Sequence, residues 1–172
     1  MNSRYCYLAA GIVGLLSFFS SSPSVDAQDK EHAELAKAMQ SVSVSLEQGL
    51  SAAASGGTPI SGKFEVEEGK LQLSVYTMKG GQFSEVIVDY KSGHVTETEK
   101  IEGGEDLAAA KAQSAAMAKT KGSLRAAVDR AVKANPGFRA VSVTPDLQGG
   151  TPTAKLTLLQ GTTFKTVSEK LN

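Results

Sequence analysis

The stretch Glu68–Phe83, EGKLQLSVYTMKGGQF, decides the fold. Every second residue from Leu71 to Thr77 is aliphatic or threonine, which places these side chains on one face of a strand. The joints Glu68-Gly69 and Lys79-Gly80-Gly81 each supply the glycine that a tight hairpin needs. The sequence therefore predicts three consecutive antiparallel strands, at Ile60–Glu67, Lys70–Met78 and Gln82–Asp89.

A helix is expected before these strands, from about Lys30 to Ala54. Its apolar residues recur at intervals of three and four, on one side of a helix: Leu35, Met39, Val42, Leu46 and Leu50. Ser45 and Gln48 match a capping box, which is also consistent with a second helix that begins there after a break. One long helix and a kinked pair both remain open, and either packs naturally on an antiparallel meander.

The second half of the sequence repeats the first. A shift of 78 residues superposes Ala38-Met39 on Ala116-Met117 and Ser45-Leu46 on Ser123-Leu124. Self-similarity at a fixed offset is typical of an internal duplication. We therefore expect an α+β fold with two repeated units, each a long helix packed on a three-stranded antiparallel β-meander.

The elements of the second unit follow from the same patterns. Apolar spacing from Leu107 to Ala131 predicts a long helix, and Asn135-Pro136-Gly137 is its stop signal. Three strands are expected after it, at Phe138–Thr144, Pro152–Leu159 and Thr163–Leu171. The expected organisation is a signal peptide at 1–27, a first unit at 28–98, a glycine-containing acidic linker at 99–105 and a more divergent second unit at 106–172.

The start of the chain resembles a secretory signal peptide. Arg4 gives a basic start, Leu8–Phe19 is apolar, and Val25-Asp26-Ala27 offers small residues around a cleavage point. The apolar run is shorter than the roughly 20 residues that cross a bilayer. We expect an exported protein, periplasmic or secreted, with no integral membrane segment after cleavage. The single cysteine, Cys6, would leave with the signal, so no disulfide is expected.

Charge and motifs argue against several classes of function. The sequence has 18 Lys and Arg against 18 Asp and Glu, whereas nucleic-acid binding needs clustered positive charge. His32 lies in a charged stretch and is expected to be exposed. His94 has Asp89, Glu97 and Glu99 nearby, but we interpret it as a turn residue after a glycine, because zinc sites usually recruit three protein ligands. We expect no catalytic, cofactor-binding or metal site, no cofactor and no enzymatic activity.

Several segments together resemble the PepSY domain family. In the first unit these are Ser45-Leu46-Glu47-Gln48, the strand Leu71–Thr77, and the segment Ser84–Val95 with its Val88-Asp89 pair and Ser92-Gly93 turn. The second unit lacks the Asp and the Ser-Gly turn. PepSY domains are small helix-plus-strand modules of exported bacterial proteins and of the propeptides of thermolysin-type metalloproteases. The resemblance implies a non-enzymatic, protein-contacting role, such as restraint of a peptidase outside the cell.

Three side chains are candidates for a protein-contact patch: Tyr76, Met78 and Tyr90. Tyr76 and Met78 fall on the strand face opposite Leu73 and Val75, and aromatic residues and Met are favoured at interfaces. A second apolar layer covered by the other unit is an equal alternative. The expected partner is another protein, a peptidase in the version that the resemblance implies, or a second copy of this chain in a structural or stress-related role in the envelope.

Overall fold

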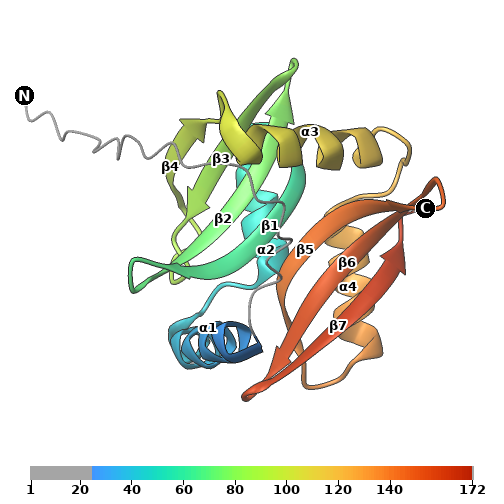
Figure 1. Cartoon of the computed structure of the whole chain (residues 1–172). Coiled ribbons are helices and arrows are strands. Elements are labelled where there is room, and N and C mark those ends of the chain that lie inside the picture. Colours follow the sequence, from blue (N-terminus) through green and yellow to red (C-terminus); the bar gives the residue numbers. More distant parts are fainter. Residues whose placement is uncertain (1–24, 172) are drawn as a thin grey trace, which may run out of the picture.

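The computed structural model describes residues 25–171 (Figure 1). Its strands form one seven-stranded sheet, antiparallel at every pairing, in the order β4-β3-β2-β1-β5-β6-β7. The elements are α1 (Val25–Ala38), a 3-10 turn (Met39–Ser41), α2 (Leu46–Ala53), β1 (Thr58–Glu67), β2 (Lys70–Lys79), β3 (Gln82–Val88), β4 (Val95–Lys100), α3 (Gly104–Met117), α4 (Leu124–Ala134), β5 (Arg139–Gln148), β6 (Thr151–Gln160) and β7 (Thr163–Lys170).

The expected fold class of two repeated units, each a long helix on a three-stranded meander, is wrong. The strands of both halves belong to one sheet, because β1 pairs with β5 through Gly62 opposite Val143 and Lys63 opposite Ser142. A short helix on a few strands buries too little apolar surface to be stable by itself. Union through β1 and β5 removes two strand edges and merges the two small cores into one.

Both helical regions are broken in two, which decides the open question of one helix or a kinked pair in the first half and corrects the long helix expected in the second. After α1 and the 3-10 turn, Ser43 and Val44 donate their N–H groups to the carbonyl oxygen of Tyr90, and α2 begins with a capping box formed by Ser45 and Gln48. α3 ends at Met117, and α4 begins after Ser123, whose hydroxyl accepts the N–H of Ala126. In both places a serine cap supplies a partner for a free helical N–H, which favours a new helix start over continuation.

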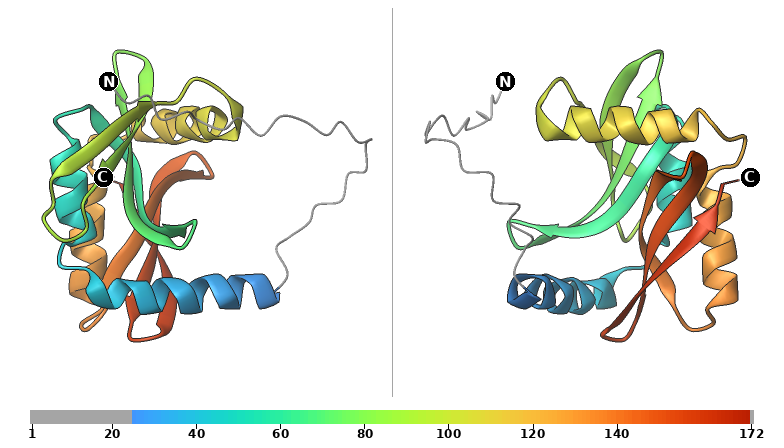
Figure 2. Two further views of the ribbon diagram at one scale, coloured as in Figure 1. Left: turned by 90° about the vertical axis from the view of Figure 1, so that its left-hand side faces the viewer. Right: turned by 45° about the vertical axis from the view of Figure 1, so that its right-hand side comes forward.

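The helices lie on different sides of the sheet. Figures 1 and 2 show α2 and α4 together on one face, α3 across the other, and α1 at one end of the strands. α2 packs tightly because it carries Gly49, where a Cβ would lie 2.5 Å from Cδ2 of Leu73. The core between the sheet and this helix pair consists of aliphatic side chains, the largest being Leu46, Leu50, Leu73, Val75, Leu124, Val128, Leu156 and Leu158.

The hairpins follow the glycine signals, with one exception in the second half. Glu68 and Gly69 both have positive φ, 50° and 74°, as a tight two-residue turn requires. The expected strand Phe138–Thr144 is too short, because β5 continues through Pro145 to Gln148 and turns at Gly149-Gly150. Pro145 is tolerated because it lies past the residues that pair with β1, where a missing N–H breaks no ladder.

Most of the expected signal peptide, 1–27, lies outside the described residues. Within residues 25–171, no helix is long and apolar enough to cross a membrane.

The shared sheet predicts a single cooperative unfolding transition for residues 28–172. Tyr76 and Tyr90 are the tyrosines after residue 27, and the sequence contains no Trp. Tyrosine fluorescence therefore reports on the first half, whereas far-UV circular dichroism reports on both. We expect the two urea transitions to coincide, as in a two-state protein. Separate midpoints would contradict a common core.

Candidate protein-binding site

The sheet has two outer edges, and they differ in how well they are protected. β4 has the sequence VTETEK, is exposed along its whole length, and has a register shift where it meets Ile87 and Val88. Charged residues and bulges are common devices against unwanted pairing. β7 has the sequence TFKTVSEK and pairs with β6 without a register shift. Its β-branched and aromatic residues favour a regular strand, so β7 is the open edge.

Hydrogen bonds show which residues of β7 turn their backbone groups outward. Leu171 donates its N–H to the carbonyl oxygen of Pro152 at 3.0 Å, so its groups point toward β6. Backbone groups alternate along an antiparallel strand, so those of Lys170 point away from the sheet. Arg130 Nη2 accordingly donates to the Lys170 carbonyl oxygen from the side, at 2.7 Å. By the same alternation Phe164, Thr166 and Ser168 direct their N–H and C=O groups outward.

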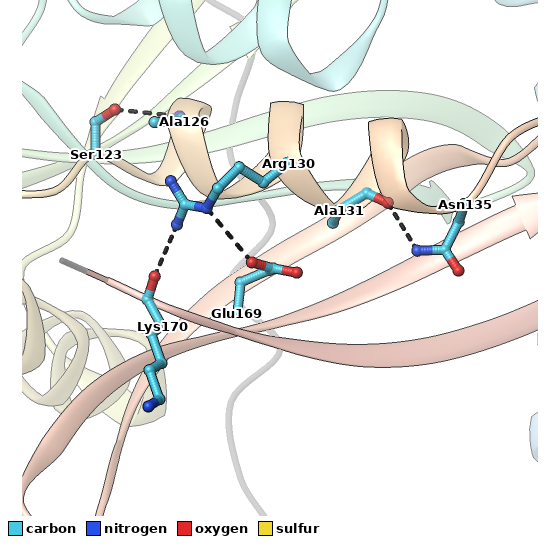
Figure 3. A network of polar contacts seen from close by, with 7 residues as sticks. All are labelled: Ser123, Ala126, Arg130, Ala131, Asn135, Glu169 and Lys170. Carbon is cyan, nitrogen blue, oxygen red and sulfur yellow. Dashed lines mark hydrogen bonds and ion pairs between the residues drawn. The ribbon is translucent and has the colours of Figure 1, made fainter.

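Helix α4 holds β7 in place from behind (Figure 3). Arg130 Nε lies 3.4 Å from Glu169 Oε2, next to its bond with Lys170. Nearer the start of the strand, Lys165 Nζ donates to Asn135 Oδ1 at 2.6 Å. Asn135 also caps α4 by donating to the carbonyl oxygen of Ala131 at 2.7 Å. These contacts fix the strand and occupy its outer edge only at Lys170.

Helix α1 contacts the beginning of β7. The rings of His32 and Phe164 are stacked, with centroids 4.1 Å apart and planes 13° from parallel. His32 is exposed, as expected, and it partly covers Phe164. Thr166 and Ser168 are exposed. The accessible part of the edge therefore runs from the middle of β7 toward its end.

The structure separates the three contact residues that the sequence suggested. Tyr76 and Met78 share one face of β2, opposite Thr58–Ser61 on β1 and Phe83–Glu85 on β3. Tyr90 lies beyond the end of β3, and its carbonyl oxygen accepts N–H bonds from the segment before α2. All three side chains are partly buried. Tyr76 and Met78 can act together, whereas Tyr90 packs against the core on the helix-pair side.

Tyr76 belongs to a polar surface on the sheet face that carries α3. We call this surface the polar face and define it by Lys63 and Glu65 on β1, Ser74 and Tyr76 on β2, Glu85 on β3, and Glu97 and Glu99 on β4. Burial, and then the charges of Glu85, Glu65 and Asp106, raise the pKa of Tyr76 far above its usual value. The hydroxyl is therefore a neutral donor at physiological pH.

Carboxylates crowd one end of the polar face. Glu85 and Glu99 are direct cross-strand partners, and like charges in such positions are destabilising. The charge of Glu97 is the main cause that raises the pKa of Glu99 above its ordinary value, with smaller effects from burial, a hydrogen bond to Glu97, and the charges of Glu85 and Glu67.

His94 lies in an exposed turn that Asp89 organises. Asp89 Oδ1 accepts the N–H and the Oγ–H of Ser92, at 2.6 and 2.7 Å, and these bonds lower the pKa of its carboxyl group. His94 itself contributes a backbone carbonyl oxygen, which accepts the N–H of Asp89. Across residues 25–171, no group of three His, Cys, Asp or Glu side chains is arranged to hold a metal ion.

No family model, curated protein or solved structure matches the chain. The geometry of the fold is therefore the basis for any proposal of function. Reasoning from sequence missed β7 as an open edge, although the expected strand Thr163–Leu171 is present almost in full as β7. The strand that ends a meander is an edge by default, and the absence of Pro and the regular alternation of TFKTVSEK were the available signals.

Replacement of Glu99 by Gln is expected to raise the Tm at neutral pH. Because the folded chain raises the pKa of Glu99, it binds this proton more tightly than the unfolded chain, so the stability contributed by the proton is lost as pH rises through the carboxyl range. The gain in Tm should be present at about pH 7 and absent at about pH 3, where ordinary Glu carboxyls are protonated. Circular dichroism melts at the two pH values measure this.

Glu34→Gln is the matched control, because Glu34 is an exposed residue of α1. An equal rise in Tm for both variants, or a rise for Glu99→Gln that persists at low pH, would show that repulsion on the polar face is not the cause.

Proposed function

We propose that this protein is an exported, non-enzymatic protein-binding module that receives an extended segment of its partner beside β7. The observation that carries the proposal is the outer edge of β7, where Thr166 and Ser168 are exposed and turn their backbone groups away from β6. An extended segment that adds to an open edge forms main-chain hydrogen bonds with it, and side-chain contacts select its sequence.

The edge supports binding of moderate strength. Each main-chain hydrogen bond contributes about 0.5–1.5 kcal/mol after the exchange with water. The contacts of Arg130 and Asn135 with β7 keep the strand in position before the partner arrives, so little entropy is lost in ordering it. Phe164, half-buried under His32, offers an apolar contact at one end of the edge.

A peptidase is the partner class that the resemblance to PepSY domains implies. In this version of the proposal, the segment that adds to β7 is an extended surface loop or propeptide of the peptidase. The direct test adds residues 28–172 to a thermolysin-type metallopeptidase and follows cleavage of a chromogenic peptide. If the cleavage rate is unchanged at a large excess of residues 28–172, the inhibitory version of the proposal is wrong. Protein binding without inhibition is then tested by the peptide experiment that follows.

Thr166→Pro is expected to abolish binding of extended peptides while the fold is retained. The N–H of Thr166 points outward, so proline removes a donor that a partner needs without breaking the β6–β7 ladder. Peptides displayed on phage are selected on residues 28–172, and their affinities for the wild-type chain and the variant are compared by fluorescence polarisation.

Two controls make this comparison specific. Thr166→Ala keeps the N–H and should bind as the wild-type chain does. Thr98→Pro places the same change on the opposite edge, at a residue of β4 that is also turned outward because Ile101 donates its N–H inward to Phe83. Normal peptide affinity for Thr166→Pro would rule out β7 as the binding edge. An equal loss of affinity for Thr166→Pro and Thr98→Pro would do the same.

Self-association through the same edge is the second candidate. A strand that pairs with its own copy around a twofold axis makes an isologous contact, and β7 has the regular ladder that this requires. Sedimentation velocity over a range of concentrations separates the two candidates. A dimer that Thr166→Pro converts to a monomer supports self-association. A monomer at all concentrations rules out self-association and leaves peptide binding as the remaining candidate.

A further inference from the structure

An apolar groove lies beside the start of α4, between α2, the start of β1 and the connection from α3 to α4. We call it the α2–α4 groove. It has a volume of about 590 Å³, and each neighbouring element contributes apolar side chains: Leu50 and Ala54 from α2, Pro59 from β1, Met117 from α3 and Leu124 from α4. Pockets that bind small molecules typically measure about 300–1,000 Å³ and have a mostly apolar lining with a few polar groups.

The charged residues of the groove are all of one sign. Lys121 and Arg125 line it, both side chains are exposed, and no Asp or Glu is among its lining residues. Among residues 25–171, neither cation takes part in an ion pair. An apolar hollow beside two unpaired cations is complementary to a molecule with an apolar body and a negatively charged end.

Two of the hydroxyl groups on the groove wall already donate to the backbone. Ser51 Oγ donates to the carbonyl oxygen of Glu47 at 2.7 Å, and Thr120 Oγ1 donates to that of Leu171. The two cations are therefore the main partners that the groove offers to a negative group. This favours a carboxylate over a phosphate monoester, which presents three acceptor oxygens and nearly two charges.

The backbone around the groove offers little to an extended peptide. Its lining residues from β1 are Thr58 and Pro59, and proline has no N–H to donate. Most of the other lining residues belong to helices or helix ends, where backbone groups bond within the helix. Recognition by apolar contact and charge, without main-chain pairing, suits a small amphiphile better than a polypeptide.

We propose that the α2–α4 groove binds a long-chain fatty acid. The hydrocarbon chain packs against Leu50, Met117 and Leu124, and the carboxylate lies between Lys121 and Arg125. Met117 suits a flexible hydrocarbon chain because its unbranched thioether adapts to irregular apolar shapes. The inference goes beyond the function proposed above, because none of the groove's lining residues belongs to β7.

The test is a calorimetric titration of residues 28–172 with decanoate and dodecanoate, each kept below the concentration at which it forms micelles. Affinity should rise about fourfold for each methylene group that the groove buries. Dodecanoate should bind more tightly than the neutral dodecyl maltoside and the cationic dodecyltrimethylammonium. Equal affinity for the anionic and the cationic amphiphile would overturn the proposal, as would tighter binding of dodecyl phosphate than of dodecanoate.

The double variant Lys121→Gln/Arg125→Gln tests the charged end of the groove. It should bind dodecanoate about tenfold more weakly, because two exposed charge pairs are lost, and should bind dodecyl maltoside as the wild-type chain does. The matched control Lys37→Gln/Lys133→Gln removes the same charge from exposed positions on α1 and α4 that do not line the groove. Equal weakening by the two double variants would show non-specific attraction and overturn the proposal.

Ala54→Trp tests the apolar part of the groove. Ala54 is an exposed lining residue at the end of α2, so a larger side chain there fills the groove without entering the core. Binding of dodecanoate should be lost while the Tm from circular dichroism is unchanged. The control Ala134→Trp makes the same change at the exposed last residue of α4, outside the groove, and should bind normally. Unchanged dodecanoate affinity in Ala54→Trp would overturn the proposal.

Discussion

The pairing of β1 with β5 is the constraint on which the rest of the structure depends. Gly62 lies opposite Val143 at this junction, and a Cβ on Gly62 would stand 3.1 Å from Cδ2 of Leu50. The missing side chain lets α2 sit close to the sheet where the two halves meet. Because the halves are joined here, α2 and α4 lie side by side over a continuous layer of aliphatic side chains, and β4 and β7 become the only strands of the described sheet with a free side.

The two faces of the sheet differ in the residues that they carry and in how far helices cover them (Figure 2). One face is covered by the helix pair and is apolar, as alternation along LQLSVYTM requires. The other carries polar and charged residues and is only partly covered, by α3. On the polar face, Glu85 and Glu99 stand directly opposite each other on neighbouring strands. That arrangement lowers stability, because like charges directly opposite each other repel.

Much of the local structure could be predicted from sequence, and the assembly of its parts could not. The hairpin at Glu68-Gly69 and the strand face of Tyr76 follow from glycine chemistry and two-residue alternation, which act between neighbours. The capping box at Ser45 indicates a new helix start, whereas the apolar spacing around it favours one continuous helix. Neighbouring residues alone do not decide between the two. The Gly62–Val143 pairing joins distant segments through backbone atoms, which carry no sequence signal. Because β7 is an open edge only in that strand order, the edge could not be predicted from the sequence either.

The position of β7 also determines how the molecule responds to force. A strand at the border of an antiparallel sheet that is pulled sideways at one of its ends loses its ladder hydrogen bonds one after another. Arg130 forms a hydrogen bond with Lys170 and an ion pair with Glu169 at the last residues of β7. These two contacts must break first when β7 is peeled from that end. A load applied along β7 would instead be shared by the whole ladder with β6. The same strand is thus weak to a pull that peels it from its Lys170 end and strong to a pull along its length.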